Sequence, residues 1–156
     1  MKMWIFTIIL VVAACSVSDN TQTSLTVPTL SRTTSLGAPG AINPAVTQAT
    51  IRTTICVSGW TKTVRPPANY TNQLKVDQIK LYNLPGKPSQ YEEDHMIPLE
   101  LGGAPTNPNN LWPQLRTGLH SAGGKDKKEN LLHKEVCNGT ITLQAARTLI
   151  MDPTSW

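Results

Sequence analysis

The residues of this chain best suited to chemistry surround Asp94 and His95, within the segment YEEDHMIPLELGG at positions 91–103. A carboxylate next to an imidazole suits a metal ligand placed beside a general base. Hard cations prefer oxygen ligands, and a neutral histidine can accept a proton near physiological pH. Asn110 follows on the far side of a loop rich in Gly, Pro and Asn. Such residue types could activate water for attack on a charged ester, for example a phosphodiester.

A second group of polar side chains runs from Lys125 to His133. Asp126, Asn130 and His133 are spaced i, i+4 and i+7, which predicts that they share one face of a helix. The alternative without a functional role is that the acidic residues stabilise the start of the helix and that His133 lies on its surface.

The order Asp94-His95, Ile-Pro-Leu-x-Leu-Gly-Gly and Asn110-Leu111 resembles the HNH (ββα-metal) nuclease motif. In that family a strand carries Asp-His, a loop follows, an Asn-Leu strand returns, and a helix completes the metal site. The resemblance covers about residues 91–133 and implies a small ββα-metal core with flanking helices in an α+β fold. It further implies that Asp94 binds the metal and His95 activates water. Asn110 would hold the loop and orient the histidine. The helical partner that the resemblance implies for the metal is expected among Asp126, Asn130 and His133, with Asn130 or Asp126 ahead of His133 and with His120, in a Gly-rich segment, last.

The same resemblance implies one divalent cation, with Mg²⁺ expected and Mn²⁺ or Zn²⁺ as alternatives. The chain has three cysteines, which rules out a Cys₄ zinc site.

Several secondary-structure elements must position these residues. Helical spacing and capping residues predict helices over 70–81, 125–137 and 142–150, the last with a threonine cap. Residues 91–101 are expected to form a strand with its turn, and 110–112 the returning strand. A helix is also expected to start within 42–54, and an extended stretch within 56–64.

The first residues have the pattern of an export signal. A charged start, an apolar run and small residues precede Cys15, and the run is shorter than the ~20 residues that a bilayer requires. The segment ending at Cys15 resembles a bacterial lipobox, which predicts lipidation of that cysteine; ordinary signal cleavage is the alternative. Residues 16–45 are rich in Ser and Thr and are expected to form a flexible linker, leaving 46–156 as the HNH-like domain.

Cys56 and Cys137 lie near opposite ends of the expected domain. An exported chain meets an oxidising compartment, so we expect them to form a disulfide; the alternative is two buried free thiols.

The formal net charge of +4 favours a polyanionic partner without deciding it. Lys62, Arg65 and Lys125 are candidates for phosphate contacts, although a solvated surface explains Lys62 and Arg65 equally well. No segment resembles a recognition helix, so little sequence preference is expected.

The sequence therefore predicts an exported, metal-dependent and non-specific endonuclease acting on DNA in preference to RNA. It would be located in the bacterial envelope as a lipoprotein, or in the periplasm or medium, with membrane contact only through the lipid and no obligate protein partner. One alternative is a catalytically inactive HNH-like module that binds nucleic acid or a protein. Another is a disulfide-containing lipoprotein in which the motif is coincidental.

Overall fold

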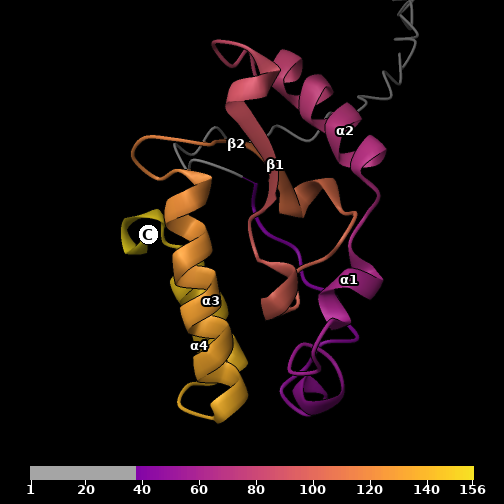
Figure 1. The fold of residues 1–156 in the computed structure, drawn as a ribbon, viewed down its shortest axis with the longest axis vertical. Helices are drawn as coiled ribbons and strands as arrows, with labels where there is room; N and C mark the ends of the chain where they lie inside the picture. Colours follow the sequence, from indigo (N-terminus) through magenta and orange to yellow (C-terminus); the bar gives the residue numbers. More distant parts are fainter. Residues whose placement is uncertain (1–37) are drawn as a thin grey trace, which may run out of the picture. The chain divides into compact units, whose positions relative to one another are not determined.

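The computed structural model of the chain describes residues 38–156, which form an α+β fold (Figure 1). The expected leader, Cys15 and most of the expected linker lie outside the described residues. In chain order the helices and strands are α1 (Trp60–Val64), α2 (Ala68–Leu81), β1 (Tyr91–His95), β2 (Leu111–Leu115), α3 (Ala122–Asn138) and α4 (Leu143–Ile150). Short 3-10 turns connect several of them.

The two strands form one antiparallel sheet, in which Tyr91 is opposite Leu115 and His95 is opposite Leu111. The expected strand–loop–strand arrangement is thus confirmed. β1 ends at His95, earlier than the expected strand, and the chain then bends into a 3-10 turn at Leu99–Leu101. Helix α2 packs on this sheet, and the Gln78 amide donates a hydrogen bond of 3.0 Å to the carbonyl of Leu111.

Both predicted C-terminal helices are confirmed with their local signals. α3 begins at Ala122, three residues before the expected start, and ends where Gly139 adopts a left-handed conformation with φ of 83°. Glycine takes that conformation without steric cost, which explains why the helix stops there. At the start of α4 the Thr142 hydroxyl accepts a hydrogen bond of 3.1 Å from the Ala145 amide, as a capping threonine does.

The region before the sheet differs from the predictions. Residues 42–54 form turns with only a short 3-10 helix at Ile51–Thr53, and the expected extended stretch contains α1. The Thr50 hydroxyl donates to the carbonyl of Ala45, and the Thr54 hydroxyl donates to the carbonyl of Thr50. Such side-chain bonds to the backbone compete with a regular helix.

The chain from Gly40 onward belongs to the folded part. Its backbone pairs with the loop between the strands: the Gly40 amide donates to Asn109, the Asn43 amide to Gly102, and Ala41 accepts from Ala104. Residues 40–45, which the sequence places in the linker, are therefore fixed against the loop that follows β1.

The apolar core joins the start of the described chain to its end. Its buried members are Val46, Ile51, Ile55, Ile97, Leu101, Leu132, Val136, Leu143, Ala146 and Ile150. Buried Arg147 of α4 donates hydrogen bonds to the carbonyls of Leu101, Val46 and Gly102 at 2.8, 3.1 and 3.3 Å. The loop after β1 is thus anchored to α4 by both apolar packing and a guanidinium group.

Cys56 and Cys137 form a disulfide, which confirms the expected pairing. It links the turn before α1 to the last turn of α3 across 81 positions of the sequence. A disulfide is consistent with an oxidising compartment. Among residues 38–156, no helix combines the length and the apolar character needed to cross a membrane.

Removal of the disulfide is expected to destabilise the fold strongly. Replacing Cys56 and Cys137 by serine releases a loop whose closure is worth about 4 kcal/mol in the chain-entropy model. Urea unfolding monitored by tryptophan fluorescence should show that loss. A double variant as stable as the wild-type protein would mean that the bond contributes nothing to the fold.

Candidate functional site at the end of β1

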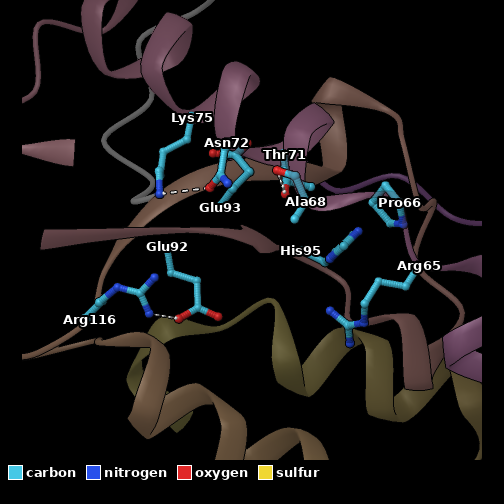
Figure 2. Close-up of a pocket in the computed structure, with 10 residues that line it drawn as sticks. All are labelled: Arg65, Pro66, Ala68, Thr71, Asn72, Lys75, Glu92, Glu93, His95 and Arg116. Atoms are coloured by element: carbon cyan, nitrogen blue, oxygen red, sulfur yellow. Dashed lines mark hydrogen bonds and ion pairs between the residues drawn. The ribbon is translucent and has the colours of Figure 1, made fainter. Parts of the chain in front are cut away.

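His95 is the last residue of β1, and its side chain is 6% exposed. It lines a cleft of about 390 Å³ between α2 and the sheet (Figure 2). The Nε2 atom lies 2.9 Å from the carbonyl oxygen of Pro105. Since a carbonyl can only accept, Nε2 must carry the proton of the neutral ring, which leaves the lone pair on Nδ1.

The charge state of His95 suits a base. Burial lowers its pKa, and the positive charges of Arg65 and Lys125 act in the same direction, while the Pro105 carbonyl and Asp94 oppose them. The imidazole is therefore neutral at physiological pH, with Nδ1 available to take a proton.

Asp94 has different partners, on the α3 side of the strand. Its Oδ2 accepts a hydrogen bond of 2.9 Å from the ammonium of Lys125, which comes from the first turn of α3. The same ammonium donates to the carbonyl of His95 at 2.7 Å and to the Glu129 carboxylate. Neighbouring residues on a strand point to opposite faces, which explains why Asp94 and His95 bind different groups.

Lys125 is fully buried. Burial acts to lower its pKa, but the carboxylates of Asp94 and Glu129 more than offset this, so the pKa is raised overall. Burial also raises the pKa of Glu129 to about 7. All three donors of the ammonium are used within the protein, so this structure offers Lys125 no contact with a substrate, in contrast to the expectation from sequence.

Of the expected ligands, Asp94 lies in β1, whereas Asp126, Asn130 and His133 follow one another along α3. The residue Asp126 is exposed as a whole, but the partial burial of its carboxyl group, and after it the charge of Asp94, raise its pKa. The Asn130 amide donates to the carbonyl of Asp126. Nε2 of His133 lies 2.8 Å from the carbonyl oxygen of Ile55.

Within residues 38–156, one group of three His, Cys, Asp or Glu side chains brings its ligand atoms within 4.8 Å of one another. It consists of Cys56, His133 and Cys137, and its two sulfurs form the disulfide. Because thiolates are the metal ligands, the oxidised pair does not supply them. Asp94 and Asp126 are not part of this group, so the side chains expected to hold one divalent cation do not come together within the described residues.

His120 lies apart from these groups. It occupies a turn with φ of 56°, and its ring stacks edge-on against Trp156 with centroids 5.8 Å apart. Its carbonyl accepts a hydrogen bond from Gln114 of β2. These contacts indicate a structural role for His120.

Asn110 is fully buried between the two ends of the loop that joins the strands. Its Oδ1 accepts from the amides of Ile97 and Ala41 at 2.9 and 3.3 Å. Its Nδ2 donates to the carbonyls of Ile97 and Ala104, both at 3.0 Å. A Cβ atom on Gly103 would lie 1.7 Å from the Ile97 carbonyl oxygen, so the loop closes this tightly only with glycine there.

Three cationic side chains line the cleft of His95: Arg65, Lys75 and Arg116. The sequence pointed to Arg65 and also to Lys62, which is exposed and outside the cleft lining. Arg116 pairs with Glu92 at 2.7 Å, while Lys75 extends from α2 beside Asn72 (Figure 2). Lys75 and Arg116 could not be singled out, because their place depends on how α2 and the end of β2 pack.

Glu93 is a further cleft residue that sequence analysis missed. It shares the α2 face of β1 with His95, as strand alternation would have indicated, and extends toward Asn72 and Lys75 (Figure 2). Both carboxyl oxygens are buried without a hydrogen-bond partner. Burial raises the pKa of Glu93 to about 8; the charge of Lys75 opposes the shift and that of Asp94 adds to it.

Comparison of the chain with models of protein families, with curated proteins and with solved structures found no match. The interpretation of the site therefore depends on its own residues and geometry.

Asn110→Asp tests the amide that closes the loop. The change preserves shape but turns a carboxylate oxygen toward the carbonyls of Ile97 and Ala104, so we expect a loss of about 3 kcal/mol or more in the free energy of unfolding. Urea unfolding would measure it. The neighbouring exposed variant Asn109→Asp is the control and should change stability by about 0.5 kcal/mol or less; equal losses would contradict the role of Asn110.

Glu93→Gln tests the buried acid. With a pKa raised from 4.5 to about 8, the folded state holds a proton that the unfolded state releases, so its stability falls as the pH rises through this window. The variant should gain about 1–2 kcal/mol at pH 9, a figure reduced for solvent screening because the residue as a whole is only half-buried, and little at pH 5. Urea unfolding at both pH values measures this. Glu92→Gln, which removes the exposed partner of Arg116, should show no such gain; a Glu93→Gln effect independent of pH would refute the assignment.

Proposed function

We propose that this protein is a small exported HNH-like phosphodiesterase that cleaves nucleic acid without sequence preference. The observation that carries the proposal is His95, a neutral imidazole with a lone pair on Nδ1, at the edge of a cleft lined by Arg65, Lys75 and Arg116. A base beside several cations matches the needs of a reaction in which water attacks a negatively charged ester.

The order of elements supports the same assignment. Two antiparallel strands joined by a loop and followed by a helix are compatible with a ββα core. His95 ends the first strand, Asn110 fastens the loop, and α3 approaches the strand end through Lys125.

In the proposed reaction His95 takes a proton from water through Nδ1 while Nε2 stays bonded to the Pro105 carbonyl. The water oxygen bonds to phosphorus, the bond from phosphorus to one ester oxygen breaks, and the departing oxygen takes a proton from solvent. That bond fixes the tautomer and the ring orientation. Arg65 and Lys75 offset the charge that develops on the phosphoryl oxygens. General-base catalysis of this kind contributes typically about 10²–10⁴-fold to a rate.

No step is assigned to a divalent cation, since the ligand atoms of Asp94, Asp126 and His133 do not form a group within 4.8 Å of one another in the described residues. The family resemblance implies that cleavage depends on Mg²⁺, and the cleavage experiment below measures this dependence.

Nucleic acid is the proposed substrate because a cationic cleft favours polyanions, and DNA is proposed ahead of RNA. The disulfide supports a location in an oxidising compartment. Lipidation at Cys15 remains part of the proposal from sequence alone.

One observation favours a second candidate function, a module that binds nucleic acid or protein without cleaving. The ammonium of Lys125 already fills the space between Asp94 and Glu129, where a catalytic cation would be expected. Such a module would keep the scaffold and the cationic cleft but lack hydrolysis.

The deciding experiment is nicking of supercoiled plasmid by the disulfide-intact protein in EDTA, Mg²⁺ or Mn²⁺. We expect nicking by the wild-type protein and a loss of at least about 100-fold in His95→Ala, since a general base contributes that much. His120→Ala is the matched control, because that ring packs against Trp156, and it should retain activity. Nicking that survives His95→Ala would refute the mechanism; a folded protein that binds DNA without nicking under any condition would establish the binding module.

A further inference from the structure

The ammonium of Lys125 lies in a site built from oxygen atoms alone. Its three neighbours are Oδ2 of Asp94 at 2.9 Å, the carbonyl oxygen of His95 at 2.7 Å and Oε1 of Glu129. We call this set the oxygen cage. A buried ammonium is costly unless it is paired and fully hydrogen-bonded, and here three donors meet three acceptors.

The oxygen cage has the composition of a site for a hard divalent cation. Such ions take carboxylate and carbonyl oxygens, which are the two kinds of atom present here. Two of the three oxygens belong to acidic side chains, so the cage needs a positive charge to balance it. A fully buried lysine from α3 supplies that charge.

The remaining acidic groups nearby lie outside the cage. Oε2 of Glu100 lies 3.6 Å from Nδ1 of His133, and Asp126 is exposed. Neither side chain hydrogen-bonds to Lys125. The cage itself is therefore the place where a metal ion and the lysine would compete.

We propose that Lys125 is the resident cation of this site: its ammonium occupies the oxygen cage of Asp94, Glu129 and the His95 carbonyl and keeps divalent metal ions out of it. Lys125 is thus a positioning residue, which ties α3 to the end of the strand that carries His95. One consequence, that hydrolysis needs no metal ion at Asp94, rests on the proposed function. The competition between Lys125 and a metal ion for the oxygen cage is independent of that function.

The test is Mn²⁺ binding, measured by isothermal titration calorimetry and by electron paramagnetic resonance. The wild-type protein should bind no Mn²⁺ that depends on Asp94, and its melting temperature should be the same in Mn²⁺ and in EDTA. Lys125→Met keeps an unbranched side chain of similar length but removes the charge. The variant should be less stable, should bind one Mn²⁺, and should regain melting temperature as Mn²⁺ is added.

Two controls locate the ion. Adding Glu129→Gln to Lys125→Met removes a cage carboxylate and should abolish the Mn²⁺ binding. Wild-type binding that Asp94→Asn abolishes would overturn the proposal, as would a folded Lys125→Met protein that binds no Mn²⁺. If Lys125→Met does not fold, Mn²⁺ binding by the wild-type protein is compared with Mn²⁺ binding by Asp94→Asn. Equal binding by the two proteins supports the proposal.

Plasmid nicking on the same samples separates this inference from the proposed function. Mn²⁺ binding that appears only in Lys125→Met, with no nicking by any protein, would support the resident cation and reject the phosphodiesterase. Nicking by wild type together with Asp94-dependent Mn²⁺ binding would do the reverse.

Discussion

The fold depends on one buried amide, that of Asn110, which closes the loop between the two strands. Its oxygen and nitrogen serve two amides and two carbonyls of three segments, including Ala41 from the beginning of the described chain. The fixed loop presents the Pro105 carbonyl to Nε2 of His95. The tautomer of the histidine, and hence which nitrogen can act as a base, follows from the closure of this loop.

β1 separates two electrostatic environments. On the α2 side, His95 and Glu93 share a cleft with Arg65 and Lys75, where burial keeps the imidazole neutral. On the α3 side, Asp94 is committed to a buried lysine. Five residues of strand thus bring together a partly open cleft, where a ligand can enter, and a closed ion-pair network that holds the helix in place.

The sequence predicted what local signals determine. Gly139 ends α3 and Thr142 starts α4, because a left-handed glycine and a capping threonine each act within one turn of a helix. The Asp-His and Asn-Leu segments form the expected pair of strands. The conformation of the region around Thr50 and the start of α1 could not be predicted from local signals, since it depends on side-chain hydrogen bonds to the backbone and on the disulfide. The burial of Lys125 could not be foreseen either, because a lysine in the first turn of a helix is ordinarily solvated. Only the approach of α3 to β1 places its ammonium among oxygens.

The composition of the core has a consequence for the order in which the chain can acquire structure. The core joins three segments that are distant in the sequence: residues 46–55, the turn with Ile97 and Leu101, and the C-terminal helices from Leu132 to Ile150. Contacts between such distant positions give slow folding, because the entropy of closing a long loop is lost before the contacts form. A chain synthesised from its N-terminal end cannot complete this core until α4 has followed. The loop after β1 likewise gains its hydrogen bonds to Arg147 only when α4 has joined the fold.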